Sequence, residues 1–496
     1  MNVVWFKRDL RLDDHAPLAK AAKLGRCLCL YVYEPELINS PEFDASHLNF
    51  INQSLTEIDQ QLKQIGGALT LRVGRMPDVL DQLHRKLGIS GLWSHEETGN
   101  KITYDRDRRV ARWAETHSIP WRQLRQNGVV RRLASRDAWS RQRTSFLKSS
   151  TISAPNLIEL PPNVESEGIQ EPGKFQLVQV NKTRLQLGGE RVGKELLQSF
   201  LHDRGENYNA ELSSPVTAWN SCSRLSPYLT WGCLSIRQVT QTLHQRRTAL
   251  RELRARGEDT GRWLTSLKAF ESRLSWHCHF IQKLEDEPAI EFENMSRAYD
   301  GIREDSFNQD YFDAWCAGRT GYPLVDACMR ALHQRSWINF RMRAMLVSFA
   351  SYHLWLHWRP TAVYLAKHFL DFEPGIHFSQ IQMQSGTTGI NTVRIYSPIK
   401  QVIDQDPTGV FIREYVPELR DVPDKHIAEP HKMTLSTQSR VGCLLGKQYP
   451  YPIVTHTTAF RAAREKIYAV KREPEAQDDA RRVFQRHGSR KRPSRR

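Results

Sequence analysis

The sequence predicts an α/β N-terminal domain, built on a doubly wound parallel sheet, followed by an all-α C-terminal half. Five short apolar runs alternate with amphipathic segments near the N-terminus, which is typical of a parallel sheet covered by helices on both faces. A stretch rich in Pro, Gly, Ser and Glu follows, and beyond it apolar residues recur at helical spacing. A chain of 496 residues also exceeds the size at which one core usually keeps growing, which favours two domains.

The predicted strands are NVVWF, CLCLYVY, LTLRVG, GLWSH and PWRQL. The segments between them, such as HLNFINQSLTEIDQQLKQ and VLDQLHRKLG, have helical periodicity. No G-x-G-x-x-G motif follows the first strand, which argues against a dinucleotide clamp in this domain. We therefore expect the domain to be either a scaffold or a pocket for a second small molecule.

In the C-terminal half, Met342, Met345, Phe349, Tyr352 and Leu356 recur at alternating intervals of three and four residues. This spacing predicts the buried face of one long helix. The patterns divide the chain into an α/β domain over 1–130, an interdomain linker over 131–190, a helical domain over 191–472 and a flexible basic tail over 473–496.

The charge balance favours a polyanionic partner such as DNA. Lys and Arg number 71 against 55 Asp and Glu, a net charge of +16. Half of this excess comes from Arg481, Arg482, Arg486, Arg490, Lys491, Arg492, Arg495 and Arg496. The tail is expected to be either solvated or an arm that grips phosphate.

Composition argues against several other classes. Eight cysteines without a C-x-x-C pair or zinc-like spacing predict reduced thiols and no metal site, although distant ligands could still hold an iron–sulfur cluster. The chain has no apolar run long enough to span a membrane, and charged residues follow the first methionine closely. We expect a cytoplasmic protein with no membrane partner.

Three segments carry candidate ligand-binding side chains. In SCSRLSPYL, Ser226 is the expected N-cap of a helix that begins at Pro227, and such a helix start favours phosphate oxygens, although most bind nothing. A later helix places Arg273, Trp276, His277 and Phe280 on one face, as either a platform for a flat ring or an aromatic core stripe. Farther on, Arg343 and the carboxylates of Asp371-Phe372-Glu373 predict a structural ion pair or a charged edge beside a bound ring.

These segments belong to motifs that resemble the photolyase and cryptochrome superfamily. WFKRDLRLDDHAPL resembles the family's first strand and turn, CSRLSPYLTWGCLS its FAD phosphate loop, and GRTGYPLVDACMRAL its most recognisable helical motif. RIYSPIKQ, FIREYVPEL and YPYPIV resemble the C-terminal run, and all occur in family order. The resemblance implies an α/β antenna domain, a helical FAD-binding domain, FAD as cofactor and room for a second antenna chromophore.

The resemblance also implies which residues hold FAD. The ribose and phosphates would contact Tyr208, Cys222, Ser223, Arg224, Leu225 and Ser226, with Cys222 standing where threonine is usual. Asp326 matches a motif acid, and Arg343 with Asp371 matches a salt-bridged pair along the flavin. The rest of that segment, Phe372, Glu373 and His377, is included in the predicted site, and either Ile376 or His377 would face flavin N5.

At the lesion cavity, Trp276 matches the family's tryptophan, whereas Arg273 replaces an expected glutamate. A guanidinium can only donate hydrogen bonds, so Arg273 would pair with carbonyl or phosphate oxygens, or turn away to an acid such as Glu271. Of the family's three electron-relay tryptophans, Trp358 matches the middle one. Ile381 occupies the inner position and the outer falls near Asp305, so photoreduction should be slow or use Trp355 or Tyr352.

These expectations give one leading hypothesis and two alternatives. The first is an enzyme in which reduced FAD, excited by blue light, donates an electron to a pyrimidine dimer in DNA. Arg273, Trp276 and Trp358 would serve that chemistry. The second is a cryptochrome-like photoreceptor that acts through a protein partner, and the third is a flavin redox protein without photobiology.

Overall fold

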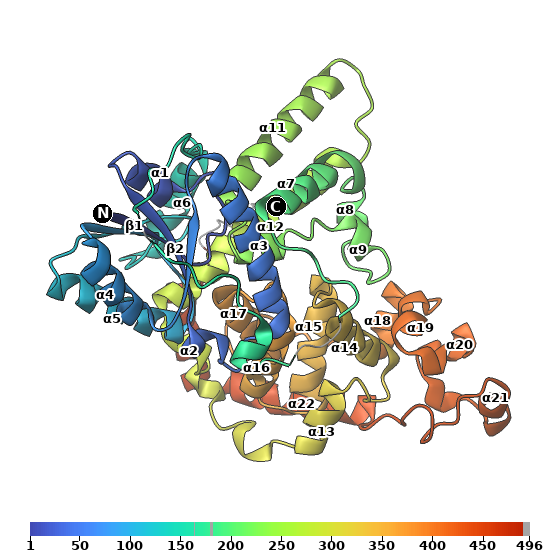
Figure 1. Ribbon diagram of the computed structural model, residues 1–496. Coiled ribbons are helices and arrows are strands. Elements are labelled where there is room, and N and C mark those ends of the chain that lie inside the picture. The colour runs from blue at the N-terminus through green and yellow to red at the C-terminus, as the bar shows by residue number, and fades with distance from the viewer. Residues whose placement is uncertain (163, 179–181, 490–496) are drawn as a thin grey trace.

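The N-terminal residues form a five-stranded parallel sheet in this computed structural model, which describes residues 1–162, 164–178 and 182–489. The strands are β1 (Asn2–Phe6), β2 (Cys27–Tyr33), β3 (Leu69–Val73), β4 (Gly91–His95) and β5 (Trp121–Leu124), in the order β3-β2-β1-β4-β5. Figure 1 shows β1 and β2 of this sheet near the N-terminus. All five coincide with predicted apolar runs. β1 is central, since Val3 pairs with both Leu28 of β2 and Leu92 of β4.

Helices cover both faces of the sheet, which confirms the doubly wound prediction. Val3 and Trp5 pack on the face covered by α4 (Met76–Leu87) and α5 (Lys101–Thr116). Val4 and Phe6 point to the opposite face, towards α1 (Ala16–Ala22) and α3 (Ala45–Gln64). Because the strand order reverses beside β1, the crevice at the carboxyl ends of β1 and β4 is where this architecture usually binds ligands.

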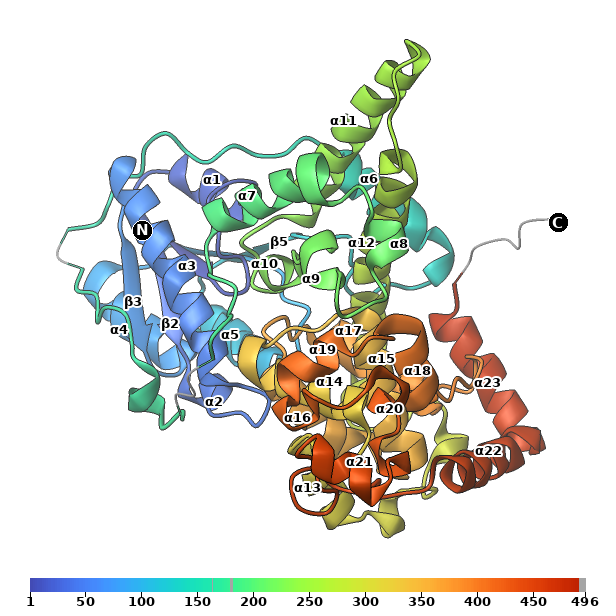
Figure 2. The same ribbon diagram turned by 90° about the vertical axis from the view of Figure 1, so that its right-hand side faces the viewer.

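The C-terminal half is helical, as predicted, and its described residues contain no β-strand. Its helices are α7 (Glu190–Ser199), α8 (Tyr208–Glu211), α9 (Ala218–Ser221), α10 (Ser226–Thr230), α11 (Ile236–Ala255), α12 (Trp263–Asp286), α13 (Gln309–Cys316), α14 (Pro323–Arg335), α15 (Phe340–Ser348), α16 (Trp358–His368), α17 (Pro374–Ser385), α18 (Pro398–Gln405), α19 (Val410–Tyr415), α20 (Asp424–Ile427), α21 (Leu435–Arg440), α22 (His456–Arg472) and α23 (Pro474–His487). The far end of α11 projects from the body of the protein (Figure 2). α12 packs against α8, α11 and α17, which makes it the central helix around the site.

The predicted long helix after Trp337 is shorter than its apolar pattern. α15 passes into a π-helical turn over Phe349–His353 and ends there. Met342, Met345, Phe349 and Tyr352 are buried along it, while Leu356 is buried in the segment that follows. The pattern therefore identified the buried face correctly but placed the end of the helix too late.

The predicted linker contains a helix. α6 (Trp139–Lys148) lies within 131–190 and packs against α11, with Trp139 and Leu147 buried. The irregular part that follows is attached to the N-terminal domain, because Ile158 N–H donates to the Ile65 carbonyl at 2.8 Å. The predicted linker thus includes α6, a short helix that packs on a partner surface.

The prediction of a flexible tail is wrong for residues 474–487. These residues form α23, whose Ala476 and Val483, seven residues apart, are both buried. His487 is buried too and pairs with Glu287, and Arg482 donates to the Met295 carbonyl at 2.9 Å. The prediction failed because the many basic residues of this segment outnumber the few apolar residues that form the buried face of α23. Residues 490–496, with the last five basic positions, lie outside the described residues.

Among the described residues, none of the helices combines the length and the apolar character needed to cross a bilayer.

Candidate functional site

A deep cavity opens among α8, α10, α12, α15 and α17, with about 1520 Å³ of space when the part open to solvent is included. It brings together side chains that lie far apart in the sequence. The predicted residues along its wall are Tyr208, Cys222, Ser223, Arg224, Leu225, Ser226, Arg273, Trp276, Arg343, Asp371, Glu373 and His377. Phe372, Asp326 and Trp358 do not line it.

One end of the cavity is a polar loop suited to phosphate. Arg204 donates to the carbonyls of Cys222 and Ser223, which holds the loop in place. Arg224 adopts a left-handed conformation with φ of 55°, and its guanidinium stacks 4.6 Å from the Trp219 ring. Helix α10 begins at Ser226 with Leu225 as N-cap, so the predicted cap is wrong by one residue. The hydroxyls and Arg224, rather than the short helix, make this end attractive to phosphate.

An ion pair forms another part of the wall. Arg343 and Asp371 make two parallel hydrogen bonds, Nη1 to Oδ1 at 3.0 Å and Nη2 to Oδ2 at 2.9 Å. Arg343 Nε also donates to the Ile338 carbonyl at 2.9 Å, and its guanidinium lies 4.1 Å from the Phe369 ring. Such a bidentate pair fixes the plane of the guanidinium. It presents an oriented charged edge to the cavity.

Ile376 and His377 both line the cavity, so the two alternatives for flavin N5 meet at the same wall. His377 Nε2 donates to the Ala362 carbonyl at 2.8 Å, and burial lowers its pKa to about 4. The ring is therefore neutral near pH 7, with its proton on Nε2. Nδ1 is left as an acceptor.

Five buried polar atoms on the cavity wall have no hydrogen-bond partner among the described residues. They are Arg224 Nε, His277 Nε2, Asn339 Oδ1, Glu373 Oε1 and Gln380 Oε1. Leaving such an atom unsatisfied costs roughly 1–3 kcal/mol, so their grouping indicates a polar ligand. FAD fits this wall, because it combines a flat ring carrying donors and acceptors with a phosphate chain. Gln380 was missed in the sequence, although it lies one helical turn after Ile376 and His377.

The mouth of the cavity carries exposed aromatic rings. Trp276 is 40% exposed and Phe340 is 38% exposed. The Arg273 guanidinium lies between them, 4.3 Å from the Trp276 ring and 5.6 Å from the Phe340 ring. Glu271 instead contacts His244 at 2.7 Å and Arg247, so the alternative in which Arg273 turns to Glu271 is wrong. Arg273 stays at the cavity.

Asp326 has a structural role, which corrects its assignment to the cofactor site. Its carboxylate is fully buried and accepts from Thr320 N and Oγ1, each at 2.7 Å, from Gly321 N at 3.1 Å and from the Tyr449 hydroxyl at 2.5 Å. Burial raises its pKa to about 6. These bonds hold the loop before α14, so the motif marks a helix start rather than a ligand contact.

Phe372 is the second correction. Its carbonyl accepts from Arg8 Nη2 at 2.6 Å, and the residue lines a pocket made mostly by the N-terminal domain instead of the deep cavity. Alternate residues of the Asp371-Phe372-Glu373 segment thus serve different pockets.

Neither of the two predicted substitutes, Trp355 and Tyr352, is favourable in an electron relay. Trp358 is fully buried and donates to Asn294 Oδ1 at 2.7 Å. Trp355 lies 4.5 Å from both the Arg303 guanidinium and the Lys466 ammonium, and nearby positive charge disfavours an oxidised indole. The Tyr352 hydroxyl has no hydrogen-bond partner among the described side chains, so no base is in place to accept its proton.

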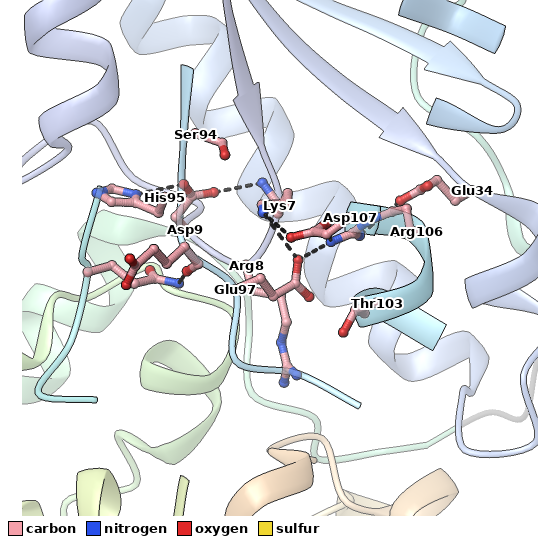
Figure 3. A network of polar contacts seen from close by, with 12 residues as sticks. Lys7, Arg8, Asp9, Glu34, Ser94, His95, Glu97, Thr103, Arg106 and Asp107 are labelled. Atoms are coloured by element: carbon pink, nitrogen blue, oxygen red, sulfur yellow. Dashed lines mark hydrogen bonds and ion pairs between the residues drawn. The ribbon is translucent and has the colours of Figure 1, made fainter. Parts of the chain in front are cut away.

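A second pocket, of about 740 Å³ with its open part included, lies at the carboxyl ends of β1 and β2 and beside the segment after β4. Its charged side chains form a network with each other (Figure 3). Arg106 pairs with Glu34 at 3.0 Å and with Glu97, and Lys7 lies 3.4 Å from Asp107. The pocket also has an aromatic lining of Trp5, Tyr31, Phe43 and Trp231. This favours the pocket interpretation of the domain over a bare scaffold.

Asp9, His15 and His95 are close enough to hold a metal ion, but their hydrogen bonds argue against it. His15 Nδ1 accepts from Leu18 N–H at 3.1 Å, so its proton is on Nε2, which donates to Asp9 at 3.0 Å. His95 Nδ1 donates to the same carboxylate at 2.7 Å. A nitrogen that carries a proton has no lone pair for a metal. The cluster is a buried hydrogen-bond centre.

The fold and cavity define a two-domain flavin-binding protein. Residues 2–137 match the family model described as DNA photolyase, and residues 270–469 match the FAD binding domain of DNA photolyase. The chain belongs to the photolyase and cryptochrome superfamily.

The similar proteins include both photolyases and cryptochromes. The chain is 26% identical to a deoxyribodipyrimidine photo-lyase of Alkalihalophilus pseudofirmus, with 92% of this chain and 95% of that protein covered. It is 27% identical to a cryptochrome DASH of Gloeobacter violaceus, covering 94% and 95%. Its fold resembles a class III photolyase from Agrobacterium tumefaciens, with a TM-score of 0.82, 24% identity and 95% and 98% coverage.

Proposed function

We propose that the protein repairs pyrimidine dimers in DNA by light-driven electron transfer from reduced FAD. The observation that carries this proposal is the open mouth of the FAD cavity, where Trp276 and Phe340 are exposed on either side of Arg273. Exposed aromatic rings provide stacking surfaces for unpaired bases, and an arginine between them can bind carbonyl or phosphate oxygens. A dimer flipped out of the helix would therefore be held next to the flavin.

The chain's own residues would hold and shield the reacting groups. Bound, reduced FAD supplies the electron. Ser223, Arg224 and Ser226 would bind its phosphates, and Arg343, oriented by Asp371, would bind the polar edge of its ring. Arg273 places positive charge where the dimer gains an electron, and that charge acts most strongly where water is excluded. The net charge of +16 supports association with the DNA backbone.

A cryptochrome-like photoreceptor is the second candidate, and the relay residues favour it. Ile381 lines the cavity at the position expected for the inner tryptophan, and Trp355 is flanked by two cations. Several of the relatives carry cryptochrome names. A flavin protein with this relay would respond to light differently from a typical photolyase, and a protein partner would transmit the response.

We also propose that the N-terminal pocket binds a second, light-absorbing ligand. Its aromatic rings suit a flat chromophore, and it lies at the crevice beside β1. Its volume is about half that of the FAD cavity, 740 Å³ against 1520 Å³. This favours a ligand smaller than FAD, whose identity mass spectrometry of the protein purified under native conditions would determine.

The decisive experiment for repair uses FAD-loaded, reduced protein. It is illuminated with single- and double-stranded DNA that contains thymine dimers, beside the variants Arg273→Ala and Arg273→Glu. Light-dependent recovery of thymines by the parent, weakened in Arg273→Ala, supports repair. If fully reduced parent protein neither repairs dimers nor binds damaged DNA selectively, the repair proposal fails and the photoreceptor is favoured.

A further inference from the structure

A small polar cavity lies between the two domains and shares a wall with the FAD cavity. It has about 460 Å³ of space, including its open part, and Thr98, Gln126 and Asn127 line its N-terminal side. These three side chains are partly exposed, so solvent water reaches this interdomain cavity. The shared wall consists of the residues that line both cavities, namely Leu229, Thr230, His277 and Glu373.

Two side chains of the shared wall carry buried polar atoms without a partner in the described part of the chain. Glu373 is 9% exposed, and its Oε2 lies 3.6 Å from Arg8 Nη2, but its Oε1 makes no hydrogen bond. His277 Nε2 is buried and equally unpaired. Buried atoms of this kind usually bind ordered water when the space beside them is polar. Water molecules bound to these two atoms would connect the two cavities through their shared wall.

We propose that Glu373 delivers protons to the bound flavin and recovers them from water in the interdomain cavity. When an external donor adds one electron to the flavin, the Glu373 carboxyl group gives its proton to the ring and becomes a carboxylate, which Arg8 stabilises. A proton from bulk solvent then returns to Glu373, relayed by water in the interdomain cavity. One electron and one proton enter the flavin, and Glu373 ends in its original state.

The charges around Glu373 suit this role. Burial is the main cause that raises the pKa of Glu373, and Glu97 raises it further, whereas Arg8 and the Gly375 backbone N–H lower it. On the helical side, His277 and His377 are neutral near pH 7, because burial lowers the pKa of each to about 4. Asp371 is engaged with Arg343. Among the described groups at this wall, Glu373 is thus the carboxyl group placed between solvent and flavin with a free oxygen.

This inference rests on FAD binding and is independent of repair, so it is tested without DNA. FAD-loaded full-length protein is mixed rapidly with a reduced viologen, which donates single electrons. Absorbance then separates the anionic from the protonated one-electron form of the flavin, in H₂O and in D₂O. We expect the parent to protonate its flavin, more slowly in D₂O. Glu373→Gln should protonate at least ~100-fold more slowly, and Glu373→Asp should restore much of the rate.

Glu291→Gln is the matched control. Glu291 is 3% exposed and has a pKa raised to about 7 by burial, but it lines neither cavity, so its variant should behave as the parent does. If the parent leaves its flavin anionic, or if Glu373→Gln with full FAD content protonates at the parental rate, the proposal is wrong. Should Glu373→Gln lose FAD, Glu373→Asp, which keeps the carboxyl group on a shorter side chain, decides instead. A flavin protonation slower than the parental one supports donation by Glu373, and a fully parental rate overturns it.

Discussion

The N-terminal pocket and the FAD cavity both carry buried charged and polar side chains, but they differ in how the hydrogen bonds and charges of these groups are satisfied. In the N-terminal pocket, Lys7 and Arg106 are paired with carboxylates of the same network (Figure 3). In the FAD cavity, five buried polar atoms have no partner within the described structure. Satisfied groups stabilise the fold by themselves, whereas unsatisfied groups destabilise it until a ligand arrives.

The comparison indicates which pocket needs its ligand. We expect the N-terminal pocket to be stable without a ligand, because its buried charges are paired within the protein. The FAD cavity is incomplete without its cofactor, and FAD binding should raise stability there by satisfying those atoms. Substitutions in the two pockets should therefore affect stability and FAD affinity in opposite ways.

The largest effect is expected from Arg106→Leu in the N-terminal network. The Arg106 side chain is 5% exposed and faces Glu34, Glu97 and Asp107, so its removal leaves buried carboxylates that only Lys7 can partly neutralise. The free energy of unfolding should fall by roughly 3–5 kcal/mol, while the surviving folded protein keeps its FAD affinity. Urea unfolding and FAD titration measure both quantities.

Arg109→Leu on the same helix is its control. Arg109 pairs with Glu36, which is about half exposed, and such pairs contribute roughly 0–1 kcal/mol. If both variants lose the same free energy of unfolding, the buried network contributes no more to stability than an exposed ion pair does.

The next effect concerns pH and His377 in the FAD cavity. Burial lowers the pKa of His377 to about 4, whereas an unfolded histidine has a pKa of about 6.5. Between these values the unfolded chain binds the proton more readily, so stability falls as pH drops below about 6.5. At pH 5 this histidine accounts for about 2 kcal/mol of that loss. In His377→Gln the free energy of unfolding should therefore fall by about that much less between pH 7 and pH 5. Urea denaturation of both proteins at the two pH values measures this difference.

A smaller effect distinguishes two glutamines on α17. Gln380→Met removes an unpaired buried oxygen, so the FAD-free protein should be unchanged or more stable by about 1 kcal/mol, while FAD binds about tenfold more weakly. Gln382→Met should instead destabilise the fold, because Gln382 bonds Ile290 O, Glu293 O and Met295 N at 2.7–2.9 Å. If Gln380→Met destabilises the FAD-free protein as much as Gln382→Met does, the unpaired oxygen is not a ligand group.

The smallest effect is expected at Cys222. Its thiol is a weak hydrogen-bond donor, and burial raises its pKa to about 12, so it stays neutral. Cys222→Thr restores the hydroxyl expected at this position and should strengthen FAD binding by about fivefold. Cys222→Val, which lacks the hydroxyl, should not strengthen it. Fluorescence titration of FAD with both variants makes the comparison.

The sequence predicted most of the fold because its strands and buried helix faces leave local periodic signals. It missed α6 and α23, which are short and highly charged, with buried faces that depend on partners distant in sequence. The cavity residues could be named from motifs, but the motifs could not separate Glu373, on the wall, from Phe372, behind it. The pairing of Arg106 with Glu34 and Glu97 has no local pattern at all, since it joins three segments of the sheet domain.

FAD binds in the helical cavity, whereas the N-terminal network needs no FAD to be complete. Titration calorimetry of FAD-free protein with FAD tests this most directly, comparing the parent with Asp371→Asn and Arg106→Leu. We expect one FAD per chain for the parent and for Arg106→Leu, and strongly weakened binding for Asp371→Asn. Loss of FAD binding in Arg106→Leu, with retention in Asp371→Asn, would contradict it.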